Sequence, residues 1–195
     1  MRFVILMSIF VILFCERKDV YKYIDIDSKQ EEYSIKRTRL NQSEFVDTKS
    51  IPYNNGVDSF VGISNDTFCV KNNNWYIKEF GKYHLFLGHE SFQKDSLLVQ
   101  LDKAVRKSDL GYWDDTLTIY PFSYIYRPVK KIFVKKNRPV YVYISTYYIY
   151  DNEIDFSSPE TVFFDPEIGI VKTNSLTSKE IVLKGYPYLD SLKIE

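Results

Sequence analysis

The chain has 195 residues, enough for one domain with a sizeable core and short for two. Its 26 basic and 26 acidic residues balance, which argues against a protein whose main partner is nucleic acid, because such proteins carry a marked basic excess. Aromatic residues make up 17% of the chain, and alanine, the best helix former, occurs once, at Ala104. The composition therefore favours β structure.

The chain opens on a largely apolar run, residues 3–14, which ends at Cys15. This run is too short to span a bilayer, which takes about 20 apolar residues. It fits the apolar core of a secretory signal, with Arg2 as the basic flank. The small residues that an ordinary signal peptidase needs before its cut are missing, apart from Ser8.

The border from Ile12–Cys15 to the charged Glu16–Asp19 resembles a bacterial lipoprotein signal. In that class the cysteine thiol takes a diacylglycerol and the chain is cut before it. The resemblance implies a signal peptide at 1–14, lipidation at Cys15 and a membrane partner through the lipid anchor. It also implies a location in the bacterial cell envelope, at the outer membrane. Phe14 departs from the pattern, since Gly, Ala or Ser is usual there, and an uncleaved N-terminus with an unmodified cysteine is the alternative.

Residues 15–50 are polar and charge-rich. We expect either a polar tether or a short N-terminal element there. A short helix is one form of that element, because Ser28 and Glu31 have the spacing of a capping box. A single β-rich domain is predicted for residues 51–195.

Short apolar runs broken by turns follow from residue 51, and they predict strands within 57–63, 66–70, 75–80 and 83–87. Asn72-Asn73-Asn74 predicts the turn of a hairpin. Residues 96–110 predict the one amphipathic helix, because Leu97, Leu98, Leu101, Ala104 and Val105 fall on one helical stripe.

Strands are also predicted within 116–136 and 139–150, joined by a turn at Asn137–Pro139. Both parities of 140–150 are apolar or aromatic, which predicts a strand covered on both faces and central in its sheet. Residues 161–164 and 169–172 predict a last hairpin. The predicted fold class is α+β, a mainly antiparallel sheet with one helix. The segment TVFFDPEIGIVK also resembles a hairpin near the C-terminus of small Bacteroidota lipoproteins of unknown role, which implies no activity.

Several residue groups suggest chemistry, but each has a simpler interpretation. His84 and His89, the only histidines, lack the further ligands that a zinc site needs. Asp151, Glu153 and Asp155 begin like a calcium loop, but Phe156 and Val162 stand where Gly and Glu are required. Asp114 and Asp115 beside Trp113 suggest a glycosidase, yet adjacent residues of a strand point to opposite faces. Cys69 is predicted to be a core residue rather than a nucleophile. No catalytic residue, metal site or cofactor is predicted.

A basic segment offers a possible contact with an anionic surface such as lipid headgroups. Its six charges are Arg127, Lys130, Lys131, Lys135, Lys136 and Arg138. A solvated sheet edge, which deters aggregation, is the simpler interpretation.

Three functional hypotheses follow. The first is a non-enzymatic envelope lipoprotein whose β-rich domain binds a partner, such as an envelope protein or glycan, or supports envelope structure. The second is a lipid- or glycan-binding module with an aromatic-lined pocket. The third, an enzyme, requires distant residues such as His84, His89 and Asp114 to converge.

Overall fold

The computed structural model describes residues 19–54, 59–106, 113, 116–134, 137–149, 158–175 and 179–192. Twelve strands form a single antiparallel sheet. The strands are β1 (Asp19–Asp25), β2 (Glu31–Arg39), β3 (Glu44–Asn54), β4 (Ser59–Lys71), β5 (Asn74–Glu79), β6 (Lys82–Gly88), β7 (Leu97–Arg106), β8 (Leu117–Val134), β9 (Arg138–Ile149), β10 (Ser158–Asp165), β11 (Gly169–Ser175) and β12 (Glu180–Leu183). Short 3₁₀ segments η1 (Ser91–Gln93) and η4 (Leu189–Ser191) accompany them.

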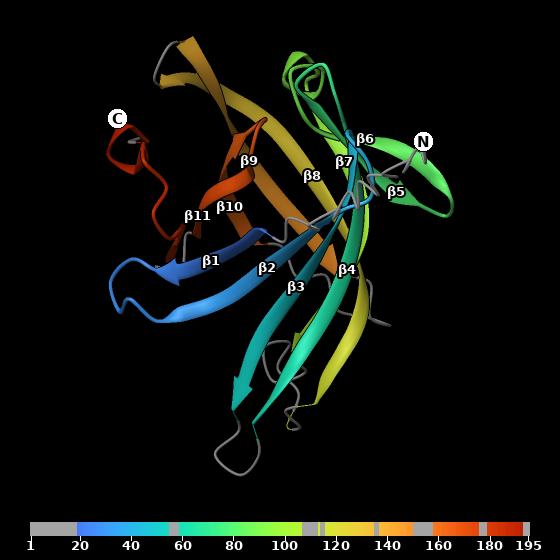
Figure 1. Cartoon of the computed structure of the whole chain (residues 1–195), viewed down its shortest axis with the longest axis vertical. Coiled ribbons are helices and arrows are strands. Elements are labelled where there is room, and N and C mark those ends of the chain that lie inside the picture. The colour runs from blue at the N-terminus through green and yellow to red at the C-terminus, as the bar shows by residue number, and fades with distance from the viewer. Residues whose placement is uncertain are drawn as a thin grey trace, which may run out of the picture.

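The sheet consists of two meanders, β1–β6 and β7–β12, joined side by side through β1 and β12. Its strand order leaves β6 and β7 as the two edge strands. The sheet curls into a nearly closed, barrel-like form, and the two meanders face each other across its interior (Figure 1). The two edges therefore come close to each other, and η1 lies on the connection between them.

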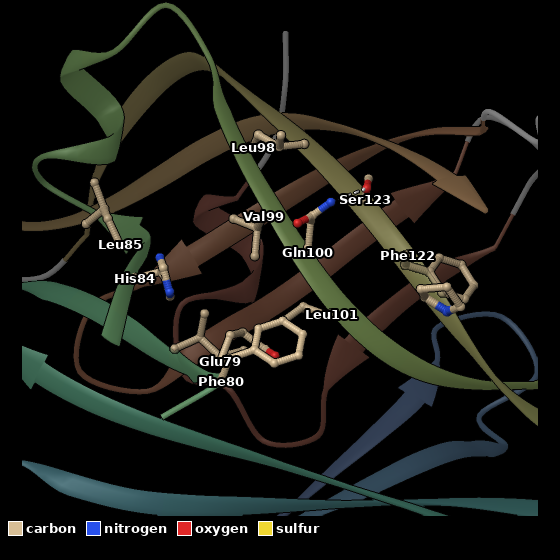
Figure 2. Close-up of a pocket in the computed structure, with 12 residues that line it drawn as sticks. Glu79, Phe80, His84, Leu85, Leu98, Val99, Gln100, Leu101, Phe122 and Ser123 are labelled. Atoms are coloured by element: carbon tan, nitrogen blue, oxygen red, sulfur yellow. Dashed lines mark hydrogen bonds between the residues drawn. The ribbon is translucent and has the colours of Figure 1, made fainter. Parts of the chain in front are cut away.

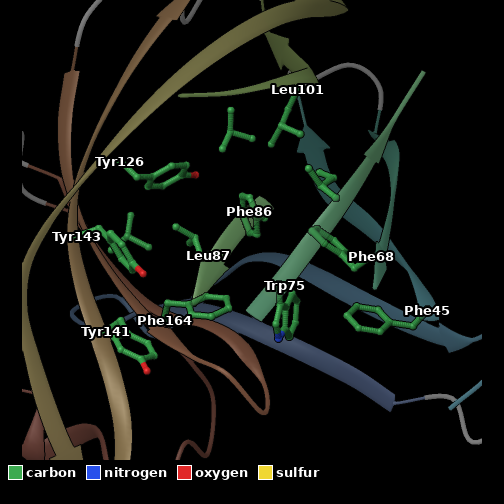
Figure 3. Close-up of a cluster of buried hydrophobic side chains, with 13 residues drawn as sticks. Phe45, Phe68, Trp75, Phe86, Leu87, Leu101, Tyr126, Tyr141, Tyr143 and Phe164 are labelled. Atoms are coloured by element: carbon green, nitrogen blue, oxygen red, sulfur yellow. The ribbon is translucent and has the colours of Figure 1, made fainter. Parts of the chain in front are cut away.

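An aromatic cluster fills the interior between the two meanders. Figure 3 shows its rings and aliphatic side chains converging from opposite walls. The Trp75 ring of β5 contacts rings from both meanders: its centroid lies 5.0 Å from that of Phe45, 5.3 Å from that of Phe68 and 5.4 Å from that of Phe164 on β10. Edge-to-face rings of this kind stabilise a core beyond their buried area, by about 0.5–1.5 kcal/mol a pair.

The prediction of a strand covered on both faces is confirmed for the first part of β9, whereas Ile144 is 41% exposed and β9 is third from the edge of the sheet. Strand β9 pairs with β8 on one side and β10 on the other. Its residues Val140–Tyr143 are buried on both faces. The tyrosines at 141 and 143 belong to the interior cluster, whereas the valines at 140 and 142 belong to a second cluster that includes Tyr186 and Leu192 of the C-terminal segment.

The predicted hairpin turns are also confirmed. β4 and β5 are joined at Asn72 and Asn73, both with positive φ, the conformation that Asn tolerates in a tight hairpin turn. β8 and β9 are joined through Asn137, and β10 and β11 through the turn that ends at Gly169.

The amphipathic helix predicted over 96–110 is wrong, and with it the α+β class. Leu97–Arg106 is strand β7, paired with β8 over its whole length. The same residues also satisfy strand alternation, since Val99 and Leu101 are buried whereas Leu98 is 62% exposed. The apolar residues of this segment fit both the helical and the strand periodicity. Pairing with β8 over ten residues supplies the backbone hydrogen bonds of a strand, and this pairing selects the strand.

The polar segment before residue 51 is part of the sheet. From Asp19 onward it forms β1, β2 and most of β3. The short helix expected after Ser28 is wrong, because Glu31–Arg39 is strand β2. The chain therefore enters the sheet four positions after Cys15.

Candidate functional site

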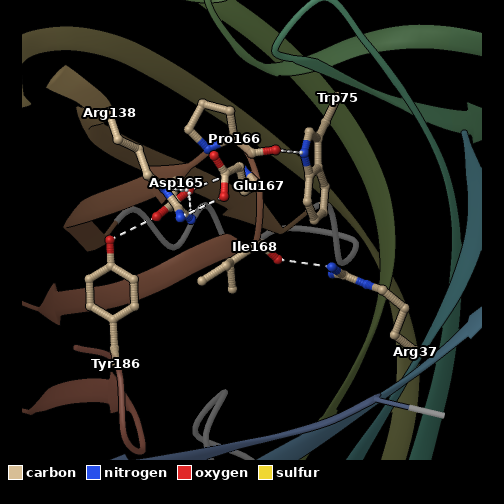
Figure 4. Close-up of polar contacts among 8 residues, drawn as sticks. All are labelled: Arg37, Trp75, Arg138, Asp165, Pro166, Glu167, Ile168 and Tyr186. Carbon is tan, nitrogen blue, oxygen red and sulfur yellow. Dashed lines mark hydrogen bonds and ion pairs between the residues drawn. The ribbon is translucent and has the colours of Figure 1, made fainter. Parts of the chain in front are cut away.

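The turn between β10 and β11 closes the interior against the opposite wall (Figure 4). The Trp75 indole Nε1 donates to the Pro166 carbonyl at 2.7 Å, and Arg37 Nη1 donates to the Ile168 carbonyl at 3.0 Å. At Gly169, with φ +114°, a Cβ would lie 2.7 Å from the Trp75 ring. Only glycine therefore lets the turn approach the indole this closely.

Arg37 and Asp47 form a buried ion pair beside this turn. Nε and Nη2 of Arg37 donate to the two carboxylate oxygens of Asp47, each at 2.7 Å. The guanidinium also lies 4.0 Å from the Phe45 ring centroid and 4.8 Å from that of Trp75. Because all three guanidinium nitrogens donate within the protein and aromatic rings pack against the group, the pair is a structural element rather than an open binding group.

Asp165 anchors the other side of the turn. Its Oδ1 accepts from Arg138 Nε at 3.0 Å and Nη2 at 2.6 Å, and its Oδ2 accepts from the Tyr186 hydroxyl at 2.8 Å. The Glu167 backbone N–H also donates to Oδ1 at 3.0 Å. The carboxylate is fully buried, so these bonds replace its lost hydration.

A cavity of about 400 Å³ lies where the two edge strands approach each other (Figure 2). The β5–β6 hairpin lines one side, and β7 with β8 lines the other. Buried Ile77, Val99, Leu101 and Phe122 belong to its lining. Ladder pairing joins β6 only to β5 and β7 only to β8 among the described strands. We call this site the seam cavity.

The polar groups of the seam cavity are few. Glu79, His84, Gln100 and Ser123 supply them, and the Gln100 amide donates to the Ser123 hydroxyl at 3.4 Å. The remaining lining comes from Phe80, Leu85, Leu98 and Pro121. Eight of the twelve described lining residues are therefore apolar, which suits a ligand with an apolar body.

An aromatic ladder continues from the seam cavity along the inner face of β8. The ring centroids of Phe122 and Tyr124 are 5.8 Å apart, and those of Tyr124 and Tyr126 are 5.9 Å apart, in stacked geometry. Tyr147 of β9 lies 5.6 Å from Phe122 and 6.0 Å from Tyr124. Because Phe122 also lines the cavity, the aromatic wall and the cavity are continuous.

The interior of the curled sheet also contains acidic and basic side chains. Lys49 and Asp66 line a second cavity of about 120 Å³, and Leu101 lines both cavities. Lys49 Nζ lies 4.0 Å from the Tyr33 ring centroid. Burial raises the pKa of the Glu160 carboxyl above its ordinary value, and the charge of Lys49 offsets part of the rise.

The two histidines do not share a site. His84 lines the seam cavity. The His89 Nε2 instead lies 3.1 Å from the Gln93 amide, and its Nδ1 lies 3.4 Å from the Tyr141 hydroxyl. Cys69 is a free thiol of intermediate exposure that belongs to neither core cluster, so its assignment to the core is wrong.

Other predicted positions lie partly outside the described residues. Asp114, Asp115 and the acidic segment 151–157 are among them, as is Cys15, whereas Trp113 is fully exposed. Within the described ranges no group of three or more Cys, His, Asp or Glu side chains could hold a metal ion. The same ranges contain no helix long and apolar enough to cross a bilayer.

The six basic residues do not form one free patch. Arg138 is bound to Asp165 and, through Nη1, to Glu167 at 2.6 Å. Lys131 lies within 6 Å of the Phe92, Phe133 and Tyr141 ring centroids. Arg127 is exposed, Lys130 is partly buried, and Lys135 and Lys136 lie outside the described residues. Contact with an anionic surface stays a prediction.

The sequence reasoning missed the seam cavity and the anchored turn. The turn itself was predicted, but its bonds to Trp75 and Arg37 join residues more than ninety positions apart. One available signal was the alternation that places Arg37, Asp47 and Lys49 on the same face as neighbouring aromatic residues of β2 and β3.

Comparisons of the chain with protein-family models, with curated proteins and with solved structures found no match.

Proposed function

We propose that this β-rich domain is a non-enzymatic binding module that takes a small molecule with an apolar body into the seam cavity. The observation that carries the proposal is the seam cavity itself, about 400 Å³ and lined mainly by apolar side chains. This volume lies within the range of about 300–1,000 Å³ typical of small-molecule sites.

The lining favours an apolar ligand over a glycan. A sugar presents many hydroxyl groups, and each one buried without a partner costs binding free energy. Only four of the twelve described lining residues carry polar side-chain groups, and two of those, Gln100 and Ser123, already bond to each other. The aromatic ladder that begins at Phe122 adds a flat apolar wall beside the cavity.

The module is proposed to act in the bacterial cell envelope, held by a lipid on Cys15. Three residues, Glu16 to Lys18, separate that cysteine from β1. The four steps from Cys15 to Asp19 span at most roughly 14 Å. A lipid at Cys15 would therefore hold the sheet directly against the headgroups, with no room for a long tether.

Binding is tested with phenylbutanol, an uncharged probe with a ring and a short chain, by titration calorimetry and ligand-observed NMR on the domain. Gln100→Trp places an indole at an exposed position of the cavity lining and should weaken binding by about tenfold or more. Lys36→Trp, at an exposed position of β2 outside the cavity lining, is the matched control. Equal affinity in the two variants, or no binding by the wild-type domain, contradicts the binding function.

The anchor is tested separately, in cells fed a clickable fatty acid. Label on the wild-type chain and its loss in Cys15→Ser are the expected results. Absence of label on the wild type, or label retained in the variant, removes the anchor and leaves the binding function to its own test.

A further inference from the structure

Phe80 has a backbone conformation that disfavours its side chain. Glu79 pairs with Lys82, so Phe80 and Gly81 form the two-residue turn of the β5–β6 hairpin. Both turn residues have positive φ, +49° at Phe80 and +79° at Gly81. A hairpin turn of this kind favours Asn followed by Gly, because Asn tolerates the left-handed region, whereas a bulky side chain is strained there.

The same chain places asparagine at comparable positions. Five described residues other than glycine have positive φ, and three of them are Asn72, Asn73 and Asn137. Phe80 is the one aromatic residue among the five. The β5–β6 turn therefore carries a phenylalanine where the neighbouring β4–β5 turn has asparagine.

Packing within the domain does not explain this phenylalanine. Phe80 is fully exposed and belongs to neither of the two core clusters. Its ring therefore gains none of the free energy that burial of an apolar side chain supplies. The residue nevertheless belongs to the lining of the seam cavity (Figure 2). Because Phe80 lines the cavity and is also fully exposed, it lies at the mouth.

The other side of the mouth is apolar as well. Leu98 on edge strand β7 lines the cavity and is 62% exposed, whereas Val99 and Leu101 of the same strand are buried. Phe122 of β8 is also a buried lining residue. An apolar ligand that rests on the buried side chains would meet Phe80 from one side of the cavity and Leu98 from the other. That contact would remove the exposed ring from water, which favours binding.

We infer that Phe80 is a ligand-binding residue that closes the mouth of the seam cavity. Its ring packs over the bound apolar molecule, and the strained turn holds the ring in place for this contact. Backbone strain of this kind occurs at ligand-binding sites, where it positions a functional residue. The inference rests on the proposed binding function and assigns a further binding residue to the same site.

The substitution Phe80→Asn tests this role, because it should change stability and binding in opposite directions. Asparagine relieves the strain of the turn, so the urea midpoint should rise, with the ratio of folded to unfolded protein about fivefold higher. Loss of the ring should weaken phenylbutanol binding about tenfold in titration calorimetry. Phe80→Tyr keeps the ring and should bind phenylbutanol within about twofold of the wild type.

The matched control is Phe133→Asn, because Phe133 is 60% exposed and lies outside the described cavity lining. This control should bind phenylbutanol as the wild type does. Equal affinity in Phe80→Asn and the wild type, or an equal loss in both Asn variants, overturns the inference and leaves the binding function intact. A lower urea midpoint in Phe80→Asn contradicts the strain at the turn. Absence of binding by the wild-type domain overturns the binding function itself.

Phe80→Trp reports the closure directly, in a chain whose exposed Trp113 is replaced by Phe. The new indole should emit as a solvent-exposed group, and its emission should shift to shorter wavelength when phenylbutanol is added. Trp75 is already buried and supplies a constant background. No shift at saturating phenylbutanol overturns the closure. A shift that follows protein concentration instead assigns the ring to a contact between copies of the chain, which also overturns the inference.

Discussion

Replacing Asp165 by Asn should destabilise the domain strongly, because this carboxylate ties together three parts of the chain. Arg138 at the start of β9, Tyr186 of the C-terminal segment and the backbone of the β10–β11 turn all donate to it. Asn keeps the shape but removes the charge, and its NH₂ replaces one acceptor by a donor that faces either the guanidinium or the tyrosine hydroxyl.

The size of the effect follows from burial. Removing one partner of a buried ion pair costs about 3–5 kcal/mol, since the other charge stays behind uncompensated. Asp165 is fully buried, but the Arg138 side chain is 21% exposed and keeps its bond to Glu167. We therefore expect the low end of the range, about 3 kcal/mol, a large part of the roughly 5–15 kcal/mol that holds a domain folded.

Urea denaturation followed by the fluorescence of buried Trp75 measures this loss. Trp113, the other tryptophan, is fully exposed and is replaced by Phe to remove its background. The midpoint should fall with little change in the denaturant slope. Asp190→Asn, an exposed carboxylate in η4, is the control and should stay within about 0.5 kcal/mol of the parent. A loss below about 1 kcal/mol in Asp165→Asn would refute the assignment of Asp165 as a buried anchor.

Two further predictions concern the turn and the interior. Gly169→Ala should lower the free energy of unfolding by about 2 kcal/mol or more, because φ is +114° and the new methyl meets the Trp75 ring; a neutral result in the same urea assay contradicts the close approach. Burial raises the pKa of Glu160, so the wild-type domain loses stability as pH rises from the unfolded pKa through the folded one. Glu160→Gln should therefore have a higher free energy of unfolding than the wild type at pH 7, and this difference should shrink towards pH 4. A difference that does not change with pH would contradict the raised pKa of the Glu160 carboxyl.

Much of the sheet was predictable because hairpins are local. The asparagine turn before Trp75, the turn at Asn137 and the turn ending at Gly169 each join strands adjacent in the chain, so their turn chemistry and alternation suffice to place them. The burial of Val140–Tyr143 on both faces was likewise visible, because both parities of that strand are apolar or aromatic.

The sequence by itself determined the β-rich character, three of the hairpins and the position of β9 between two neighbouring strands. The tertiary structure alone decided that Leu97–Arg106 is a strand, since its apolar residues satisfy two periodicities and only pairing with β8 selects one. It also decided the seam cavity and the anchoring of the 165–169 turn. Both depend on the curl of the sheet, which brings its two edges together and places residues such as Ile77 and Phe122 around one cavity. A local sequence pattern does not predict contacts between residues so far apart in the chain. Hydrophobic alternation determines which face of the sheet a residue occupies, but not which residues lie opposite it.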